Sequence, residues 1–201
     1  MKNLRQVVLI RHPKPDIAAG ICYGSSDVLP QPAALKFAFD GLDRYLPHDA
    51  QIITSPLARC AQLALQLSER AQRQCKSDAR LTERHCGAWE LQPWDKVPRA
   101  ELDAWATDFM DYTAPRAESV RQMQTRVLAA WEEYTRQIVQ QNLTLITHAG
   151  PLQVLLAHLT GAQLCVKPIV VVACGAAVVL TRKSNTAAHW DFRVDNSMVA
   201  G

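Results

Sequence analysis

Val7-Val-Leu-Ile-Arg-His-Pro-Lys-Pro15 is the stretch from which the fold of this chain can be worked out. Its four apolar, mostly β-branched residues predict a buried strand. The strand must end at Arg11-His12, because Pro13 has no backbone N–H and restricts the residue before it. An Arg and a His therefore reach the carboxyl end of a strand, where open α/β sheets bind ligands. There a guanidinium can clamp an anion, and an imidazole can act as a nucleophile or proton carrier.

A second copy of this arrangement lies far downstream, in Leu143-Thr-Leu-Ile-Thr-His148-Ala-Gly-Pro151. An apolar, β-prone run again stops at a His, and an apolar helix-like stretch follows at 152–159. Each site alone also fits an ordinary surface, capping or core residue. Two histidines in matching contexts, one of them beside an Arg, indicate an anion-binding site.

Length and composition indicate one soluble domain. A chain of 201 residues can bury one substantial core, so we expect a single domain over residues 1–201. The net charge is only +3, and the 22 Lys and Arg form no run of like charge. Nucleic acid is therefore not an implied partner, whereas a small anionic substrate is allowed.

The six cysteines contain no Cys-x-x-Cys pair, which disfavours both a disulfide framework and a zinc site. The apolar run from Val7 to Ile10 is too short for a signal peptide. A later run, 169–180, is shorter than a membrane span and is interrupted by Gly175. We therefore expect a cytoplasmic protein without a membrane partner, and the oligomeric state, including a homodimer, stays open.

Strand and helix patterns alternate along the chain, which favours a three-layer α/β/α sandwich with a mostly parallel central sheet. Ser55-Pro56 predicts a helix start, with Ser55 as the N-cap. The segment 85–115 is the least regular. Strands are expected at 7–10, 51–54, 143–147, 169–173, 176–181 and 188–194, and helices at 33–45, 56–73, 118–140 and 152–159.

Two further segments carry charged residues beside these elements. In Ser55-Pro-Leu-Ala-Arg59-Cys-Ala-Gln62, Arg59 lies near a helix N-terminus, whose free N–H groups favour anions. In Leu81-Thr-Glu83-Arg-His-Cys-Gly87-Ala-Trp89-Glu90, a carboxylate follows an extended piece and precedes a turn. Alone, each also fits a solvated side chain on a helix or in a loop.

In this order, the segments resemble the histidine phosphatase superfamily, in its phosphoglycerate mutase-like branch. The resemblance covers most of the chain, and among small members it is most similar to bacterial α-ribazole phosphatase-like enzymes. Six pieces carry it: Arg11-His12, Gly24 to Asp27, Ser55 to Gln62, Leu81 to Glu90, Glu118-Ser119 and His148.

The resemblance implies a catalytic role for five residues. His12 would attack phosphorus and form a phosphohistidine. Arg11, Arg59 and His148 would surround the phosphoryl group with positive charge. Glu83 would protonate the departing alkoxide and then take a proton from water. The family chemistry implies neither a metal ion nor another cofactor, and the partner would be a small phosphorylated substrate.

The chain departs from the family pattern after the nucleophile. Members usually have Gly after this His, whereas Pro13 offers no N–H to a phosphate oxygen. We therefore expect either that Lys14 or the loop at Ser25-Ser26 contacts the phosphate, or that the protein is a weaker catalyst than its relatives. Tyr23 is a further candidate for substrate binding, and the Trp residues of the irregular segment are candidates for an apolar wall, or alternatively for the core: Trp89, Trp94 and Trp105.

Three functions remain open. The first is a metal-independent phosphomonoesterase acting on a small metabolite, such as α-ribazole phosphate or a sugar phosphate. The second is a mutase, which is disfavoured because the chain is shorter than mutases of this family. The third is a non-catalytic phosphate-binding or regulatory module, suggested by Arg-His-Pro but disfavoured by Glu83, which binding alone would not require.

Overall fold

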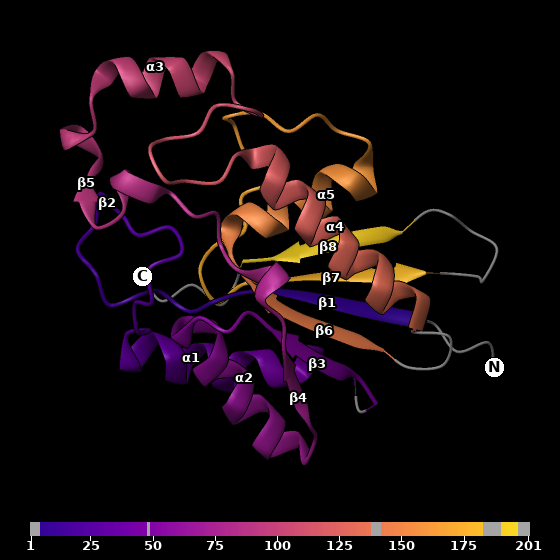
Figure 1. Ribbon diagram of the computed structural model, residues 1–201. Helices are drawn as coiled ribbons and strands as arrows, with labels where there is room; N and C mark the ends of the chain where they lie inside the picture. The colour runs from indigo at the N-terminus through magenta and orange to yellow at the C-terminus, as the bar shows by residue number, and fades with distance from the viewer. Residues whose placement is uncertain (1–4, 48, 138–141, 183–189, 197–201) are drawn as a thin grey trace.

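The structure is a computed structural model that describes residues 5–47, 49–137, 142–182 and 190–196. A six-stranded sheet consists of β1 (Arg5–Arg11), β3 (Gln51–Thr54), β4 (Cys75–Ser77), β6 (Leu143–Thr147), β7 (Ala177–Arg182) and β8 (Asp191–Asp195). Its strand order is β4-β3-β6-β1-β7-β8 (Figure 1). The strands from β4 to β1 are mutually parallel, and β7 runs antiparallel to both neighbours, so the sheet is mostly parallel as expected.

Helices cover both faces of this sheet (Figure 1). Val8 and Ile10 pack in the cluster with α1 (Pro32–Leu42) and α2 (Ala58–Ala71). Val7 and Leu9 point the other way, into the cluster with α4 (Val120–Gln137) and α5 (Ala149–Thr160). Because successive side chains of a strand alternate between the faces, a strand covered on both sides is apolar throughout. This confirms the three-layer α/β/α sandwich.

The register of two neighbouring strands brings the two histidines together. β1 and β6 are parallel, and Arg11 pairs with Thr147. The residues that follow, His12 and His148, therefore leave the same edge of the sheet next to one another. Neither position depends on loop conformation, because each strand is buried in the middle of the sheet.

A small lobe lies beyond this edge (Figure 1). It contains the short strands β2 (Ile21–Cys22) and β5 (Gln92–Pro93), which pair with each other, and the helix α3 (Arg99–Thr107). The segment expected to be irregular thus includes a helix. The lobe has its own apolar cluster, formed by Cys22, Cys86, Trp89, Val97 and Ala114. Short 3₁₀ helices occur at Asp43–Tyr45, Ala79–Leu81, Gly87–Trp89 and Trp94–Lys96.

The strand expected at 169–173 is absent, and the prediction is wrong. The carbonyl of Val170 accepts a hydrogen bond from Gln153 Nε2, and the carbonyl of Val172 accepts one from Arg11 Nη1. These carbonyls bind side chains near the sheet edge instead of a neighbouring strand. Parts of two other predicted elements, 138–140 and 188–189, lie outside the described residues.

Ser55 does not cap α2, which begins at Ala58 with no side-chain cap from its own segment. The Ala58 N–H donates instead to Asp27 Oδ1, at 2.6 Å. A carboxylate 31 residues earlier thus supplies the acceptor that the helix terminus needs. Within the described residues, no helix has both the length and the apolarity needed to cross a bilayer.

Candidate active site

His12 and His148 lie in contact at the carboxyl edge of the sheet, with 5.0 Å between their ring centroids. Both side chains are buried. The His12 Nδ1 atom is 2.7 Å from the Pro13 carbonyl oxygen. A carbonyl only accepts hydrogen bonds, so Nδ1 carries the proton and Nε2 keeps a free lone pair. Pro13 therefore sets the tautomer that a nucleophilic histidine needs, although it has no N–H to give.

Burial, together with the nearby charges of Arg59 and Arg11, lowers the pKa of His12 to about 3 against the opposing effect of the Pro13 hydrogen bond. The ring is therefore neutral at physiological pH. A neutral imidazole beside two guanidinium groups is the form that can attack an electrophile.

Arg11 and Arg59 are both held by backbone carbonyls. Arg11 Nη1 donates to Val172 O at 2.8 Å. Arg59 donates from Nη1 to Ser26 O and from Nη2 to Gly24 O, each at 2.7 Å. The Nε atoms of both side chains are buried and make no hydrogen bond within the described residues. Two fixed cations with unused buried N–H groups next to His12 form an anion-binding site.

His148 Nε2 lies 2.7 Å from Ser55 Oγ and 3.5 Å from Cys60 Sγ. Burial, together with the Coulombic effects of His12 and the two arginines, lowers the pKa of His148 well below its ordinary value. The ring is thus neutral in the free protein. In the free protein the fixed positive charge therefore lies on Arg11 and Arg59, and the positive charge expected of His148 beside a phosphoryl group stays a prediction.

Glu83 is tied to the segment that follows His148. Its Oε2 accepts a hydrogen bond from the Gly150 N–H at 3.1 Å, and its Oε1 accepts one from the Arg84 N–H at 2.9 Å. Glu83 also lines the same cavity as Arg11. The structure therefore brings all five residues that were expected to be catalytic to one edge of the sheet.

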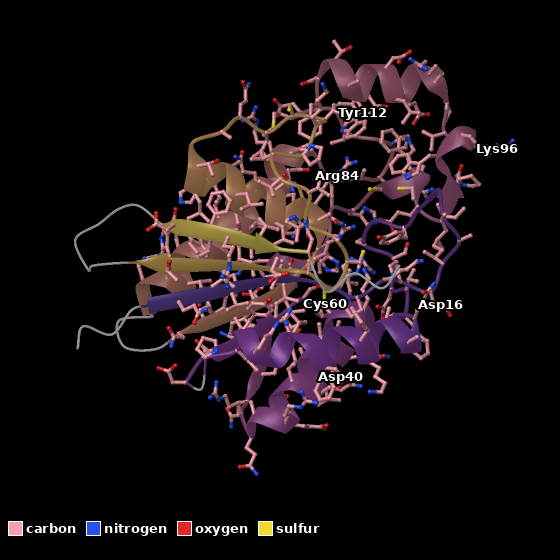
Figure 2. The ribbon with its side chains drawn as sticks, turned by 180° about the vertical axis from the view of Figure 1, so that it is seen from behind. Asp16, Asp40, Cys60, Arg84, Lys96 and Tyr112 are labelled. Carbon is pink, nitrogen blue, oxygen red and sulfur yellow. The ribbon has the colours of Figure 1, made fainter. Side chains whose placement is uncertain are left out.

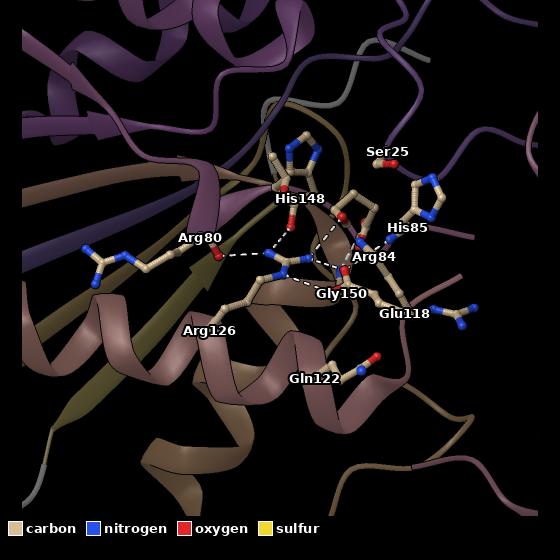
Figure 3. Close-up of polar contacts among 12 residues, drawn as sticks. Ser25, Arg80, Arg84, His85, Glu118, Gln122, Arg126, His148 and Gly150 are labelled. Atoms are coloured by element: carbon tan, nitrogen blue, oxygen red, sulfur yellow. Dashed lines mark hydrogen bonds and ion pairs between the residues drawn. The ribbon is translucent and has the colours of Figure 1, made fainter. Parts of the chain in front are cut away.

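Sequence reasoning missed Arg126, which holds the backbone around Glu83 (Figure 3). Its Nη1 donates to the carbonyls of Arg80 and Thr82, and its Nη2 donates to that of Glu83. It also pairs with Glu118, whose carboxylate accepts the His85 N–H. Glu118 belongs to a quoted family motif, but an Arg eight residues later gave no local signal.

A family model described as the histidine phosphatase superfamily (branch 1) matches residues 7–190. The chain belongs to this superfamily. No curated protein matches the sequence.

Solved structures share the fold. A mycobacterial glucosyl-3-phosphoglycerate phosphatase is 21% identical, with a TM-score of 0.79, over 96% of this chain and 99% of that one. A proposed alpha-ribazole-5'-P phosphatase from Escherichia coli is 20% identical, with a TM-score of 0.82, over 99% of both chains. YhfR from Bacillus stearothermophilus is 19% identical, with a TM-score of 0.81, over 95% of this chain and 96% of that one.

In this histidine phosphatase, the other expected phosphate contacts are placed differently. The Ser25 N–H and Oγ both donate to Glu90 Oε1, at 3.0 Å each, so these donors already have an acceptor. Ser26 Oγ also donates to Glu90. The Lys14 side chain is exposed and makes no hydrogen bond to the described residues. The structure thus does not place Ser25 or Lys14 as contacts to the phosphate, because Glu90 holds the loop and Lys14 faces solvent.

Tyr23 lies over the site as expected of a substrate contact. Its ring centroid is 6.4 Å from that of His12, and the Arg59 guanidinium carbon is 5.1 Å from its ring centroid. Tyr23 also lines a cavity of about 400 Å³ that Arg11 and Glu83 reach from the phosphate side. A group bound between Arg11 and Glu83 would have this cavity beside it.

Of the three tryptophans that were candidates for the wall, two line the cavity and one belongs to the core. Trp94 and Trp105 contribute to the wall. Trp89 is only 2% exposed, and its Nε1 donates to Glu101 Oε2 at 2.6 Å. Of the two alternatives, Trp89 therefore takes the core position, since its indole N–H and its ring are both used within the lobe.

Gly150→Ala tests the placement of Glu83. A Cβ at position 150 would lie 2.2 Å from Glu83 Oε1 and 3.0 Å from Met123 Sδ. The flexible Glu83 side chain can move away at little cost in stability, but it then leaves its position. We expect activity on an alkyl phosphate to fall by about 10²-fold, the effect of a displacement of about 1 Å. Full activity with an unchanged unfolding midpoint would contradict the assigned position of Glu83.

Because His12 is buried and neutral, the free energy of unfolding depends on pH. The unfolded chain protonates this residue near its ordinary pKa of 6.5, and the folded chain does so near pH 3. Between these values the unfolded state binds more protons, so the stability is complete above pH 6.5 and is lost as the pH falls. Between pH 7 and 5, His12→Asn should lose about 2 kcal/mol less unfolding free energy than the wild type.

Urea unfolding at the two pH values measures this difference. His158→Asn is the control, because His158 is exposed on α5. An equal pH dependence in the wild type and in His12→Asn would show that His12 is not held neutral in the fold.

Proposed function

We propose that this protein is a phosphomonoesterase that hydrolyses a small phosphorylated metabolite through a phosphohistidine at His12, without a metal ion. One observation carries the proposal: Arg11 and Arg59 hold buried, unused Nε–H groups within the described structure, and both guanidinium groups lower the pKa of His12. A phosphate group supplies the anionic oxygens that these donors lack, and it brings phosphorus to the free Nε2 lone pair.

The reaction then proceeds in two displacements. His12 Nε2 attacks phosphorus while the P–O bond to the leaving group breaks, and Glu83 gives its proton to the departing oxygen. In the second step Glu83 takes a proton from water, and the water oxygen displaces His12 from phosphorus. Inorganic phosphate leaves, and both residues return to their starting states. Arg11 and Arg59 stabilise the charge on the equatorial oxygens in both steps.

The geometry favours an enzyme over a phosphate-binding module. The Arg-His-Pro sequence suggested weak catalysis because Pro13 lacks an N–H, but its carbonyl orients the nucleophile. The carboxylate of Glu83 lies beside the cationic site, where a pure anion-binding protein gains nothing from a negative charge. Names of similar structures include phosphatases for glucosyl-3-phosphoglycerate and alpha-ribazole-5'-P. We propose α-ribazole phosphate and sugar phosphates as the first substrates to test.

A screen of phosphorylated metabolites, with release of inorganic phosphate as the readout, tests this function. Activity is expected to survive excess chelator, because the two arginines supply the charge that a metal ion would otherwise provide. Vanadate, which mimics five-coordinate phosphorus, is expected to inhibit strongly. Loss of activity on chelation that is restored by zinc or magnesium would refute the metal-free mechanism. Absence of turnover with every ester, p-nitrophenyl phosphate included, would favour the binding module.

A further inference from the structure

Arg84 is a buried cation for which the described part of the chain supplies no ion-pair partner. Arg84 is only 8% exposed, yet its guanidinium makes no hydrogen bond or ion pair with any residue that the structure describes. Figure 2 shows it between the sheet layers and the lobe that carries Tyr112. An unpaired buried charge is costly, so a natural protein that keeps one usually has a use for it.

The nearby carboxylates are already used. Glu83 accepts two backbone N–H groups, from Gly150 and from Arg84 itself. Glu90 accepts hydrogen bonds from Ser25, Ser26 and Cys86. Glu101 accepts the indole N–H of Trp89. None of these carboxylates forms an ion pair with Arg84 among the described residues, so the structure leaves room for a counter-ion supplied by a ligand.

A second unsatisfied donor lies beside Arg84. The Nε1 atom of Trp105 is buried and has no hydrogen-bond partner in the described part of the chain. The Arg84 guanidinium carbon is 5.5 Å from the Trp105 ring centroid. Both residues line the 400 Å³ cavity that Arg11 and Glu83 reach from the phosphate side. Two buried N–H donors, one of them charged, thus belong to residues that line the space into which the leaving group extends.

We propose that Arg84 and Trp105 form a subsite that binds a carboxylate on the leaving group of the substrate. One unpaired guanidinium matches one negative charge, and a planar carboxylate accepts two N–H donors at once. The rest of the wall is largely apolar, with Phe109, Met123 and Leu164. The preferred substrate is then a phosphomonoester whose leaving group has an apolar body and a carboxylate. This assignment rests on the proposed phosphatase function and narrows its substrate class.

Matched aryl phosphates test the subsite. The probes are the meta and para isomers of carboxyphenyl phosphate, each compared with the carbamoylphenyl phosphate of the same shape. A carboxamide withdraws electrons more strongly and gives the better leaving group, so chemistry alone favours the neutral probe. In the wild type we expect kcat/KM to favour the carboxylate of at least one isomer by about 10- to 100-fold, as for a hydrogen bond to a charged group.

Two variants assign that preference to the subsite. Arg84→Gln removes the charge and should bring the carboxylate-to-carboxamide ratio close to one. Trp105→Phe keeps an aromatic ring but removes the N–H, and it should lower the ratio by about threefold to tenfold. Arg99→Gln is the control, because Arg99 is an exposed arginine of α3 that pairs with Asp103, and its ratio should equal that of the wild type.

Binding to His12→Ala separates the subsite from the catalytic proposal. Calorimetry with the same probes, in protein that cannot form a phosphohistidine, should show tighter binding of the carboxylate, and Arg84→Gln in that background should remove the difference. Turnover without any carboxylate preference would overturn the proposed subsite but would leave the proposed phosphatase function standing. If the His12→Ala protein binds the carboxylate selectively but the wild type shows no turnover, the proposed subsite stands and the proposed phosphatase function is overturned. Equal binding of both probes would overturn the subsite.

Discussion

Replacing His12 with alanine is expected to abolish turnover while the fold remains intact. His12 has the free Nε2 lone pair and lies beside both arginines, so no other side chain of the described site is placed to take the phosphoryl group. Removal of a covalent nucleophile in another enzyme class costs on the order of 10⁶-fold in kcat. We expect a loss of that order here, measured as phosphate release under single-turnover conditions.

The covalent intermediate provides the direct readout. Substrate labelled in the phosphoryl group should leave label on the wild-type protein after a rapid quench without acid, which preserves phosphohistidine. The His12→Ala protein should carry no label, and His158→Ala should behave as the wild type because His158 is an exposed residue of α5. Label that persists on His12→Ala would remove His12 from the role of nucleophile.

Glu83→Gln should lose activity in proportion to how much the leaving group needs a proton. General acid catalysis is worth about 10²–10⁴-fold, but only for a poor leaving group. With an alkyl phosphate, the phosphorylation step should therefore fall by about this factor. With p-nitrophenyl phosphate, whose phenolate leaves readily, the same step should fall far less.

The comparison of leaving groups is needed because the substitution also changes hydrogen bonding. Glu83 accepts N–H groups on both carboxylate oxygens, from Arg84 and from Gly150, whereas a Gln amide has one oxygen and must present its NH₂ to the other donor. That disturbance affects both substrates alike and cancels in their ratio. Single-turnover phosphorylation must be measured, because slower dephosphorylation would mask the difference in steady state. Equal losses for both substrates would show that Glu83 acts through charge or structure, and the acid would then be sought at Glu90, Asp27 or His85.

The residues that meet at the sheet edge could be predicted because strand patterns and parallel topology place them. Two apolar runs that each stop at a His are local signals, and parallel strands end at the same edge of a sheet. Arg11 and His12 follow from the first run, and His148 follows from the second. Arg59 and Glu83 were expected only from the resemblance to the family motifs, and the structure brings them to the same edge.

The contacts within the loops could not be predicted, because they join residues far apart in the chain. Asp27 rather than Ser55 accepts the Ala58 N–H at the start of α2, while Ser55 Oγ accepts the Leu57 N–H and lies against His148. Ser25 donates to Glu90, 65 residues later, and is therefore occupied. A side chain with several polar neighbours takes the partner that folding brings nearest, and the sequence does not say which one that is.

The sequence by itself therefore determined the layered sheet and the residues that meet at its edge, because periodicity and strand ends are local properties of the chain. Only the tertiary structure decided which polar groups remain without a partner. It satisfies Ser25 and leaves Lys14 in solvent. Among the residues that it describes, it gives no hydrogen-bond partner to Arg84 Nη1 or to the indole N–H of Trp105 beside the cavity. The physical reason is that burial and hydrogen-bond satisfaction depend on all surrounding elements at once.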